Sequence, residues 1–316
     1  MPIRQELADF EGIFKKLMKS DIPLLGIILN YIYRTKGKQI RPMFVFLSAA
    51  MVGKPNDFTQ VAASSVELLH TATLVHDDVV DESYERRGLF SVKALWRNKM
   101  AVLVGDYILA RGLLLQLEHR QYQFLHLISR AAREMSEGEI LQIKKSRKPD
   151  IDIDTYFDII RKKTASLIAT SMAIGAASVT EDPEVIDKMY RIGQNAGIAF
   201  QIKDDIFDYQ EKGIIGKPTG NDIREKKITL PMLHLLHSAG SAERLRLLRI
   251  IRNRNKKAGE VRELVRKVTD SGGIEFATQQ MNLFREKAIE ELNEFPESRA
   301  RDSLIDLMHY ITERDK

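Results

Sequence analysis

The chain has 316 residues, 44% of them hydrophobic and 29% charged, with 18 glycines, 9 prolines and no cysteine. The apolar fraction is sufficient for a large core, and the scarcity of glycine and proline disfavours disorder, collagen-like repeats and many-stranded β folds. Without cysteine there is no disulfide, thiolate metal site or cysteine nucleophile. No secretory signal or transmembrane segment is visible, so we expect a soluble, cytoplasmic protein.

The formal net charge of +5 comes from one segment. Residues 241–270 carry ten Lys or Arg against four Asp or Glu. Leu245, Leu248 and Ile251 recur there at helical spacing, without the interleaved aromatic residues that nucleic-acid surfaces use for stacking. The segment is therefore interpreted as the solvated faces of two amphipathic helices, and no nucleic-acid partner is expected.

Helical periodicity dominates the chain from end to end. After an apolar pattern over residues 13–32, Pro42 is placed to open a helix in its first turn, where its missing N–H costs nothing. Further helices are predicted over residues 58–80, 100–117, 124–143, 156–179 and 183–209. No strand-like alternation and no linker interrupts the pattern, so we predict one all-α domain over residues 1–316 with ten or more helices.

Two aspartate clusters of the form D-D-x-x-D stand out in this pattern. They comprise Asp77, Asp78 and Asp81, and Asp204, Asp205 and Asp208. Residues four apart lie on one helix face, where like charges repel. A solvated acidic face is the ordinary interpretation, but each cluster follows an apolar run, so its carboxylates require a cation. Oxygen ligands without cysteine favour Mg²⁺ over Zn²⁺.

Basic residues elsewhere could balance phosphate groups. They are Lys38, Arg41, Arg86, Arg87, Lys163, Lys217 and Lys227. Mg²⁺ held by carboxylates typically bridges to substrate phosphates. Together these residues predict a site for two polyphosphorylated substrates.

The sequence resembles the trans-polyprenyl diphosphate synthases over nearly its whole length. The matching motifs, in order, are Gly37–Pro42, Glu67–His70, Leu74–Asp81, Arg86–Gly88, Gly105–Asp106, Met135–Gly138, Lys163–Thr164, Phe200–Asp208, Gly216–Lys217, Asp222–Pro231 and Tyr310–Arg314. A single D-D-x-x-D would be weak support, whereas two of them with the basic motifs in order are specific.

The resemblance implies a single-domain barrel of mostly antiparallel helices around a deep central cavity, the isoprenoid synthase fold. It also implies a prenyltransferase that condenses isopentenyl diphosphate with an allylic diphosphate by ionisation, condensation and elimination. Three Mg²⁺ ions with substrate bound would be held by Asp77, Asp78, Asp81, Asp204 and Asp208. Asp205 and Lys163 would complete the catalytic set. A homodimer is expected, with transient membrane contact for product release.

The resemblance divides the remaining residues between two substrates. Isopentenyl diphosphate would be bound by Lys38, Arg41, His70 and Arg87. The allylic diphosphate would be bound by Arg86, Lys163, Thr164, Gln201, Lys217 and Lys227. Purely structural alternatives stay open for His70 and Thr164, and Asp205 could support its neighbours rather than bind metal. Two departures from the family pattern, Leu89–Ser91 and Arg97 where glycine is usual, affect the expected loop geometry.

Product length is predicted from helix geometry above the first motif. Ala72 and Thr73 lie about one turn deeper than Asp77, and short-chain members of the family place an aromatic residue at one of these positions. Both residues are small, and Leu69 one turn further narrows the path without closing it. We therefore expect a heptaprenyl to decaprenyl product, octaprenyl favoured, for a use such as a quinone side chain. The alternatives are that Ala72 serves only close helix packing, or that the enzyme makes farnesyl or geranylgeranyl diphosphate.

Two other functions fit the motifs less well. A terpene cyclase also ionises prenyl diphosphates, but its second metal motif generally differs, and Lys38 and Arg41 would be superfluous. A non-catalytic synthase subunit would be expected to have lost aspartates or the arginine pair, all of which are present here.

Overall fold

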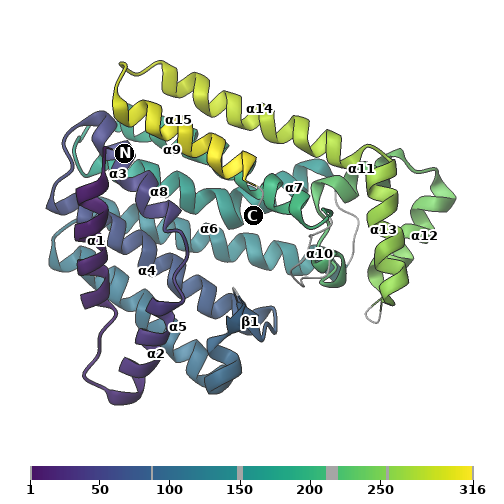
Figure 1. Ribbon diagram of the computed structural model, residues 1–316, viewed down its shortest axis with the longest axis horizontal. Coiled ribbons are helices and arrows are strands. Elements are labelled where there is room, and N and C mark those ends of the chain that lie inside the picture. The colour runs from purple at the N-terminus through teal and green to yellow at the C-terminus, as the bar shows by residue number, and fades with distance from the viewer. Residues whose placement is uncertain (1, 87, 148–151, 211–219, 254–255, 315–316) are drawn as a thin grey trace. The chain divides into compact units, whose positions relative to one another are not determined.

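The chain is almost entirely helical (Figure 1), as the periodicity predicts. The structure is a computed structural model that describes residues 2–86, 88–147, 152–210, 220–253 and 256–314. Its elements are α1 Arg4–Leu17, α2 Pro23–Arg34, α3 Ile40–Val52, α4 Asp57–Val80, β1 Glu85–Arg86, β2 Leu89–Phe90, α5 Val92–Glu118, α6 Tyr122–Arg147, α7 Ile153–Ile160, the π-helical turn η1 Arg161–Ala165, α8 Ser166–Ala177, α9 Pro183–Phe207, α10 Asn221–Arg224, α11 Leu230–Ser238, α12 Ser241–Arg252, α13 Ala258–Asp270, α14 Gly273–Asn293 and α15 Arg299–Glu313.

The chain divides into two compact units. Unit 1 comprises Met1–Ala132, Leu167–Gly193 and Phe295–Leu304, and unit 2 comprises Arg133–Ser166, Gln194–Glu294 and Ile305–Lys316. Unit 1 holds α1 to α5, and unit 2 holds α7, η1 and α10 to α14. The first aspartate motif belongs to unit 1 and the second to unit 2. The organisation as one domain stays a prediction.

Helix α4 carries the first motif, and its start is well defined. The Asn56 side chain accepts hydrogen bonds from the backbone N–H groups of Phe58 (2.8 Å) and Thr59 (3.2 Å), and the Thr59 hydroxyl accepts one from the N–H of Asn56 (3.0 Å). This capping box satisfies donors that the first turn leaves unpaired. The small residues Ala62 to Ser65 are buried, and α4 packs against α5 and α3.

Helix α5 begins after Ser91, whose hydroxyl accepts from the N–H of Ala94 (3.1 Å). Among the described helices, it alone is long and apolar enough to cross a bilayer, with a mean hydropathy of 1.5 over its most apolar window. Helices of soluble proteins can have the same length and apolar composition, so one such helix is weak support for a membrane span. Only a third of that window is buried, which leaves an apolar surface on α5.

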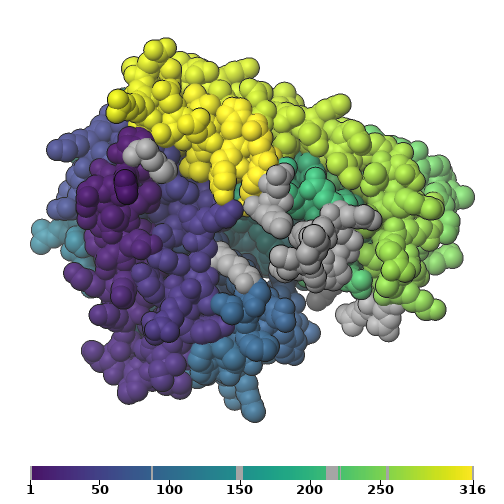
Figure 2. Space-filling model, in the orientation of Figure 1, coloured from purple at the N-terminus to yellow at the C-terminus, as the bar shows by residue number. Residues whose placement is uncertain are grey.

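The core of unit 2 forms where α9, α11, α13 and α14 meet. Ile202, Leu230, Leu264 and Ala277 are fully buried members of one hydrophobic cluster. Within unit 2, the end of α15 lies beside α14 (Figures 1 and 2), and the guanidinium of Arg285 donates to Glu313 Oε1 at 3.1 Å across that contact. The end of α15 is thereby held near its partners in unit 2.

Three local features differ from the expected helices. The segment expected as one helix over 156–179 is helical from Ile153 to Ala177 without a break, but it contains the π-helical turn η1 between α7 and α8. The two-residue strands Glu85–Arg86 and Leu89–Phe90 pair in antiparallel fashion beside Gly88, whose φ of +76° favours glycine. Helix α5 starts at Val92 rather than near residue 100, because a short helical segment precedes a kink at Arg97, where the dihedral angles are not helical.

Candidate functional site

The first aspartate motif lies at the C-terminal end of α4. Asp77 and Asp78 belong to the last turn, and Asp81 is the first residue after the helix, its N–H bonded to the carbonyl of Asp77 at 2.8 Å. The C-terminal end of a helix carries partial negative charge, so carboxylates there are electrostatically unfavourable without a cation. The position of the motif thus strengthens the expectation of a cation at this end of the helix.

Asp78 points away from solvent and is held by Arg86. The Arg86 Nε donates to Asp78 Oδ1 at 2.8 Å, and Asp78 is 3% exposed. Burial raises the pKa of Asp78, and the neighbouring Arg86 guanidinium opposes that rise. This ion pair favours a supporting role for Asp78, and it ties Arg86 of β1 to the motif. Arg87 lies outside the described residues.

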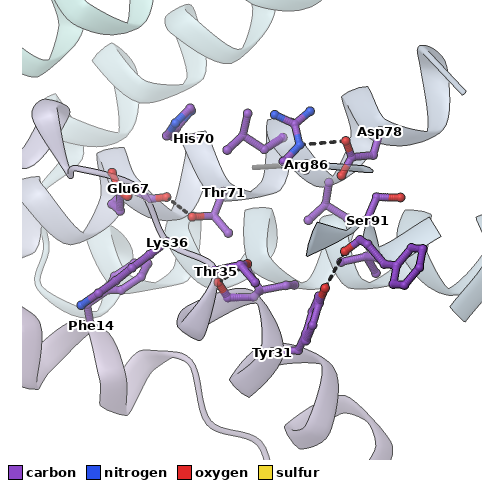
Figure 3. Close-up of a pocket in the computed structure, with 16 residues that line it drawn as sticks. Phe14, Tyr31, Thr35, Lys36, Glu67, His70, Thr71, Asp78, Arg86 and Ser91 are labelled. Atoms are coloured by element: carbon purple, nitrogen blue, oxygen red, sulfur yellow. Dashed lines mark hydrogen bonds and ion pairs between the residues drawn. The ribbon is translucent and has the colours of Figure 1, made fainter. Parts of the chain in front are cut away.

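A small cavity of about 60 Å³ adjoins this end of α4 (Figure 3). Its lining includes Gly37, Glu67, His70, Asp78 and Arg86. In Figure 3 the labelled His70, Asp78 and Arg86 lie along one side, and the Thr71 hydroxyl donates to the Glu67 carbonyl at 2.7 Å.

Two residues predicted to bind isopentenyl diphosphate meet beside this cavity. Arg41 Nη1 lies 3.0 Å from His70 Nε2. A guanidinium can only donate, so Nε2 is the acceptor and the His70 proton is assigned to Nδ1. Lys38 lies three residues before Arg41, in the loop between α2 and α3.

His76 links α4 to the Gly105–Asp106 motif of α5. Its Nε2 lies 3.3 Å from the carbonyl oxygen of Val102 and 3.2 Å from Asp106 Oδ1. A Cβ on Gly105 would lie 2.2 Å from that nitrogen, so only glycine leaves room for the imidazole. Gly105 and Asp106 therefore serve to pack α5 against His76, next to the first aspartate motif.

The residues predicted to set product length are not equally accessible. Ala72 and Leu69 are almost fully buried, at 1% and 2% exposure, whereas Thr73 is half-buried. The Thr73 hydroxyl donates to the His70 carbonyl at 2.8 Å. The burial of Ala72 is compatible with the alternative that this residue serves only close helix packing. Thr73, one turn from Asp77, is the more accessible of the two positions.

The second aspartate motif repeats this arrangement at the end of α9 in unit 2. Asp204 and Asp205 lie in the last turn, and Asp208 follows the helix. Asp205 is 5% exposed, and its carboxylate accepts hydrogen bonds from Tyr156 Oη (2.7 Å) and Gln201 Nε2 (3.0 Å). Burial raises the pKa of Asp205 to about 6 even though these hydrogen bonds oppose the rise. Both Asp205 oxygens are occupied by the protein, which favours a positioning role.

Asp222 joins this cluster, although the sequence motifs assign it no role. Its N–H donates to Asp208 Oδ2 at 3.0 Å. Burial, followed by the charges of Asp205 and Asp208, raises the pKa of Asp222 to about 7. No periodicity links Asp222 to Asp208, and Tyr156 is likewise brought in only by the tertiary fold.

Lys163 lies on the π-helical turn η1, a structure often found at functional sites. Its Nζ donates to Gln142 Oε1 at 2.9 Å and forms an ion pair with Glu139, both on α6. A Cβ on Gly138 would lie 2.8 Å from the Lys163 backbone nitrogen, so this glycine allows α6 to approach η1.

Other residues predicted for the allylic site are also placed in unit 2. The Thr164 hydroxyl donates to Gln201 Oε1 at 2.6 Å, which connects it through Gln201 to Asp205. Lys227 Nζ donates to Glu225 at 2.6 Å. Lys217 lies outside the described residues. Thus Lys163, Thr164, Gln201 and Asp205 are all held by contacts within one unit.

The donor chemistry of both motifs fits Mg²⁺. Within the described part of the chain, no three acidic or histidine side chains converge to hold a metal by themselves. Mg²⁺ is typically bound through one or two carboxylates plus substrate phosphates and water, which is the coordination that such motifs can supply. The pKa values of the buried carboxyl groups of Asp205 and Asp222 are raised, so a cation bound near them would stabilise their ionised forms.

Comparison with known proteins gives matches over most or all of the chain. A family model described as polyprenyl synthetase matches residues 22–268. The chain is 33% identical over 313 residues to an octaprenyl diphosphate synthase of Escherichia coli (strain K12), covering 99% of this chain and 97% of that protein. A crystal structure of a decaprenyl diphosphate synthase from Rhodobacter capsulatus matches with a TM-score of 0.94 and 32% identity, covering 100% of this chain and 98% of that one. A geranylgeranyl pyrophosphate synthase structure from Bacteroides thetaiotaomicron matches with a TM-score of 0.86 and 35% identity, over 99% and 97% of the two chains.

Proposed function

We propose that this chain, which belongs to the polyprenyl synthetase family and is a prenyltransferase, condenses isopentenyl diphosphate with an allylic diphosphate into a long all-trans product. The observation that carries the proposal is the pair of D-D-x-x-D motifs, each at the C-terminal end of a long helix. Basic side chains also lie in the same unit as each motif: Arg86 with the first motif in unit 1, and Lys163 with the second motif in unit 2.

Mg²⁺ is the proposed cofactor, held through Asp77 and Asp81 in unit 1 and through Asp204 and Asp208 in unit 2. When bound, it would supply positive charge that stabilises the diphosphate leaving group. Asp78 and Asp205 would act differently, because each is already bonded to protein groups. We assign them to the orientation of their neighbours.

Basic side chains would complete diphosphate binding. Lys163 is held in place by Gln142 and Glu139, so its ammonium group is pre-oriented before substrate arrives. Arg41 and His70 already touch, which supports their assignment to one diphosphate, that of isopentenyl diphosphate. The isopentenyl double bond would then attack the allylic carbon that ionisation exposes, and the resulting cation would lose a proton to the departing pyrophosphate to restore a double bond. No side-chain nucleophile is needed.

Relatives that make octaprenyl and decaprenyl diphosphate support a long product, heptaprenyl to decaprenyl. The small side chains of Ala72 and Thr73 support it independently. The match to a geranylgeranyl pyrophosphate synthase keeps a short product as the second candidate.

Product sizing tests the proposal. The purified chain is incubated with isopentenyl diphosphate, Mg²⁺ and farnesyl diphosphate, and the products are separated by length. We expect mainly heptaprenyl to decaprenyl diphosphate, and a geranylgeranyl end product would refute the long-chain assignment. No turnover with any allylic starter would refute the synthase assignment for the isolated chain.

Phenylalanine substitutions then locate the path of the growing chain. Thr73→Phe and Ala72→Phe should shorten the product to farnesyl or geranylgeranyl length while the first condensation stays active. Because Ala72 is buried, overpacking there can cost about 1–3 kcal/mol of stability, so Thr73→Phe is the more decisive variant. Unchanged long products from a folded Thr73→Phe would place the path on another face of α4.

We further propose that the enzyme acts in the cytoplasm as a homodimer. Helix α5 exposes Leu95, Val102, Leu103, Leu114 and Leu117, an apolar surface typical of an interaction site. Light scattering should give twice the chain mass of 36.2 kDa, and a monomer at micromolar concentration would argue against the dimer.

A further inference from the structure

The end of α15 supplies a cation to the second aspartate motif. The Arg314 guanidinium forms an ion pair with Asp204 Oδ1 through Nη2. Arg314 is the first residue after α15, and its N–H still bonds to the Tyr310 carbonyl at 3.1 Å. A contact between residues 110 positions apart therefore forms at a carboxylate to which the metal is assigned.

The arginine is fixed rather than loosely attracted. Its guanidinium carbon lies 4.6 Å from the ring centroid of Phe200 and 5.5 Å from that of Phe207, so two rings of α9 stack against it. Its side chain is only 14% exposed. Cation–π contacts of a desolvated guanidinium strengthen such a pair beyond a surface salt bridge.

This geometry brings the arginine and a metal into competition. Arg314 occupies one oxygen of Asp204 and adds a positive charge beside it, and both effects oppose the approach of a second cation. In the metal-free protein, the same contact offsets the charge of a carboxylate at the negative end of α9.

We propose that Arg314 is a resident counter-ion of Asp204 that divalent metal must displace, so that the C-terminal end of α15 regulates metal loading of the second motif. The proposal rests on the proposed function, because it assumes that Asp204 binds the metal. Arg314 is thus a positioning residue for Asp204 whose removal should make metal binding easier.

Metal affinity of the substrate-free protein tests this directly. Free Mn²⁺ is measured by electron paramagnetic resonance during titration of wild type and Arg314→Gln, without and with inorganic pyrophosphate. Arg314→Gln should bind Mn²⁺ roughly fivefold more tightly, the size of change that loss of one partly buried ion pair would give. Equal or weaker binding by this variant would overturn the proposal, since a purely structural clamp gives that result.

The matched control is Arg301→Gln, also on α15. Arg301 is similarly buried, at 13% exposure, but its ion pairs are with Glu297 and Asp302. This control should bind Mn²⁺ as the wild type does, and an equal tightening there would contradict a specific role of Arg314. Deletion of residues 314–316 is a second variant that removes the Arg314 guanidinium. It should also bind Mn²⁺ more tightly than the wild type, and it tests the proposal even if Arg314→Gln impairs folding.

Asp204→Ala separates this inference from the proposed function. If it binds Mn²⁺ as the wild type does, the metal assignment of the second motif is wrong and both proposals fail. If it binds less Mn²⁺ than the wild type while Arg314→Gln matches the wild type, the metal site at the second motif stands and only the counter-ion role fails.

Discussion

Arg97 occupies a backbone conformation that suits glycine. Its φ of 67° and ψ of 167° lie in a region that L side chains rarely adopt, although the residues on either side are helical. Such strain costs on the order of 1–3 kcal/mol, whereas a glycine costs roughly 0.5–1 kcal/mol in chain entropy. Arg97→Gly should therefore stabilise the protein by about 1 kcal/mol, measured as the free energy of unfolding in urea.

Lys99 provides the control for this substitution. It is exposed on α5 with helical dihedral angles, so Lys99→Gly brings the entropic cost without relief of strain and should destabilise by about 0.5–1 kcal/mol. A destabilised Arg97→Gly would show that the arginine makes compensating contacts. The position is already notable in the sequence, because the family pattern has glycine there.

At individual positions, the residue type indicated which side chains needed a polar partner, but it did not indicate which residue that partner would be. Lys163 on an apolar helix required compensation, and Gln142 and Glu139 provide it. Asp222 and Tyr156 could not be assigned, since the burial that brings them to Asp205 depends on packing between distant segments.

The π-helical turn η1 depends on a close approach by α6. A Cβ at Gly138 would lie 2.8 Å from the Lys163 backbone nitrogen, and backbone cannot move aside as a flexible side chain can. Gly138→Ala should therefore shift η1 and misplace the Lys163 ammonium group. Small misplacements of binding groups can cost roughly 10²-fold in rate, so we expect a loss of that order in kcat.

Gly12→Ala is the matched substitution in a helix. Nothing lies within 4 Å of a Cβ at this exposed position of α1, so alanine should stabilise by about 0.5–1 kcal/mol and leave kcat unchanged. Wild-type kcat in Gly138→Ala would show that the position of η1 does not matter for turnover.

Long helices were well predicted because their apolar periodicity is local. The segment expected over 58–80 is α4 at Asp57–Val80, and the one over 183–209 is α9 at Pro183–Phe207. The hairpin of β1 and β2 and the π-helical turn were missed, because two-residue strands show no alternation and a one-residue change in hydrogen bonding leaves periodicity almost intact. The placement of both motifs at helix ends also emerged only in the structure.

For the molecule as a whole, buried acidic groups without a bound cation make stability dependent on pH. Burial is the main reason that the pKa values of Asp205 and Asp222 rise to about 6 and about 7, from 3.8. Between the unfolded and folded pKa values, the folded protein holds more protons than the unfolded chain, so its stability falls as pH increases. The stabilisation is fully present below about pH 4 and is lost once pH passes about 7.

Asp222→Asn isolates the larger of these effects. In EDTA, wild type and variant should be similarly stable near pH 4, where Asp222 is still partly protonated in the unfolded chain as well; above that pH the variant should become the more stable protein, and its advantage should grow by on the order of 1–3 kcal/mol between pH 5 and pH 8. Mg²⁺ with inorganic pyrophosphate should raise the wild-type unfolding temperature most at the higher pH, because a bound cation favours the ionised carboxylates. Differential scanning calorimetry across this pH range measures both effects. A constant difference between the two proteins from pH 5 to pH 8 would show that Asp222 does not titrate in this window, and hence that its charge is already balanced within the protein.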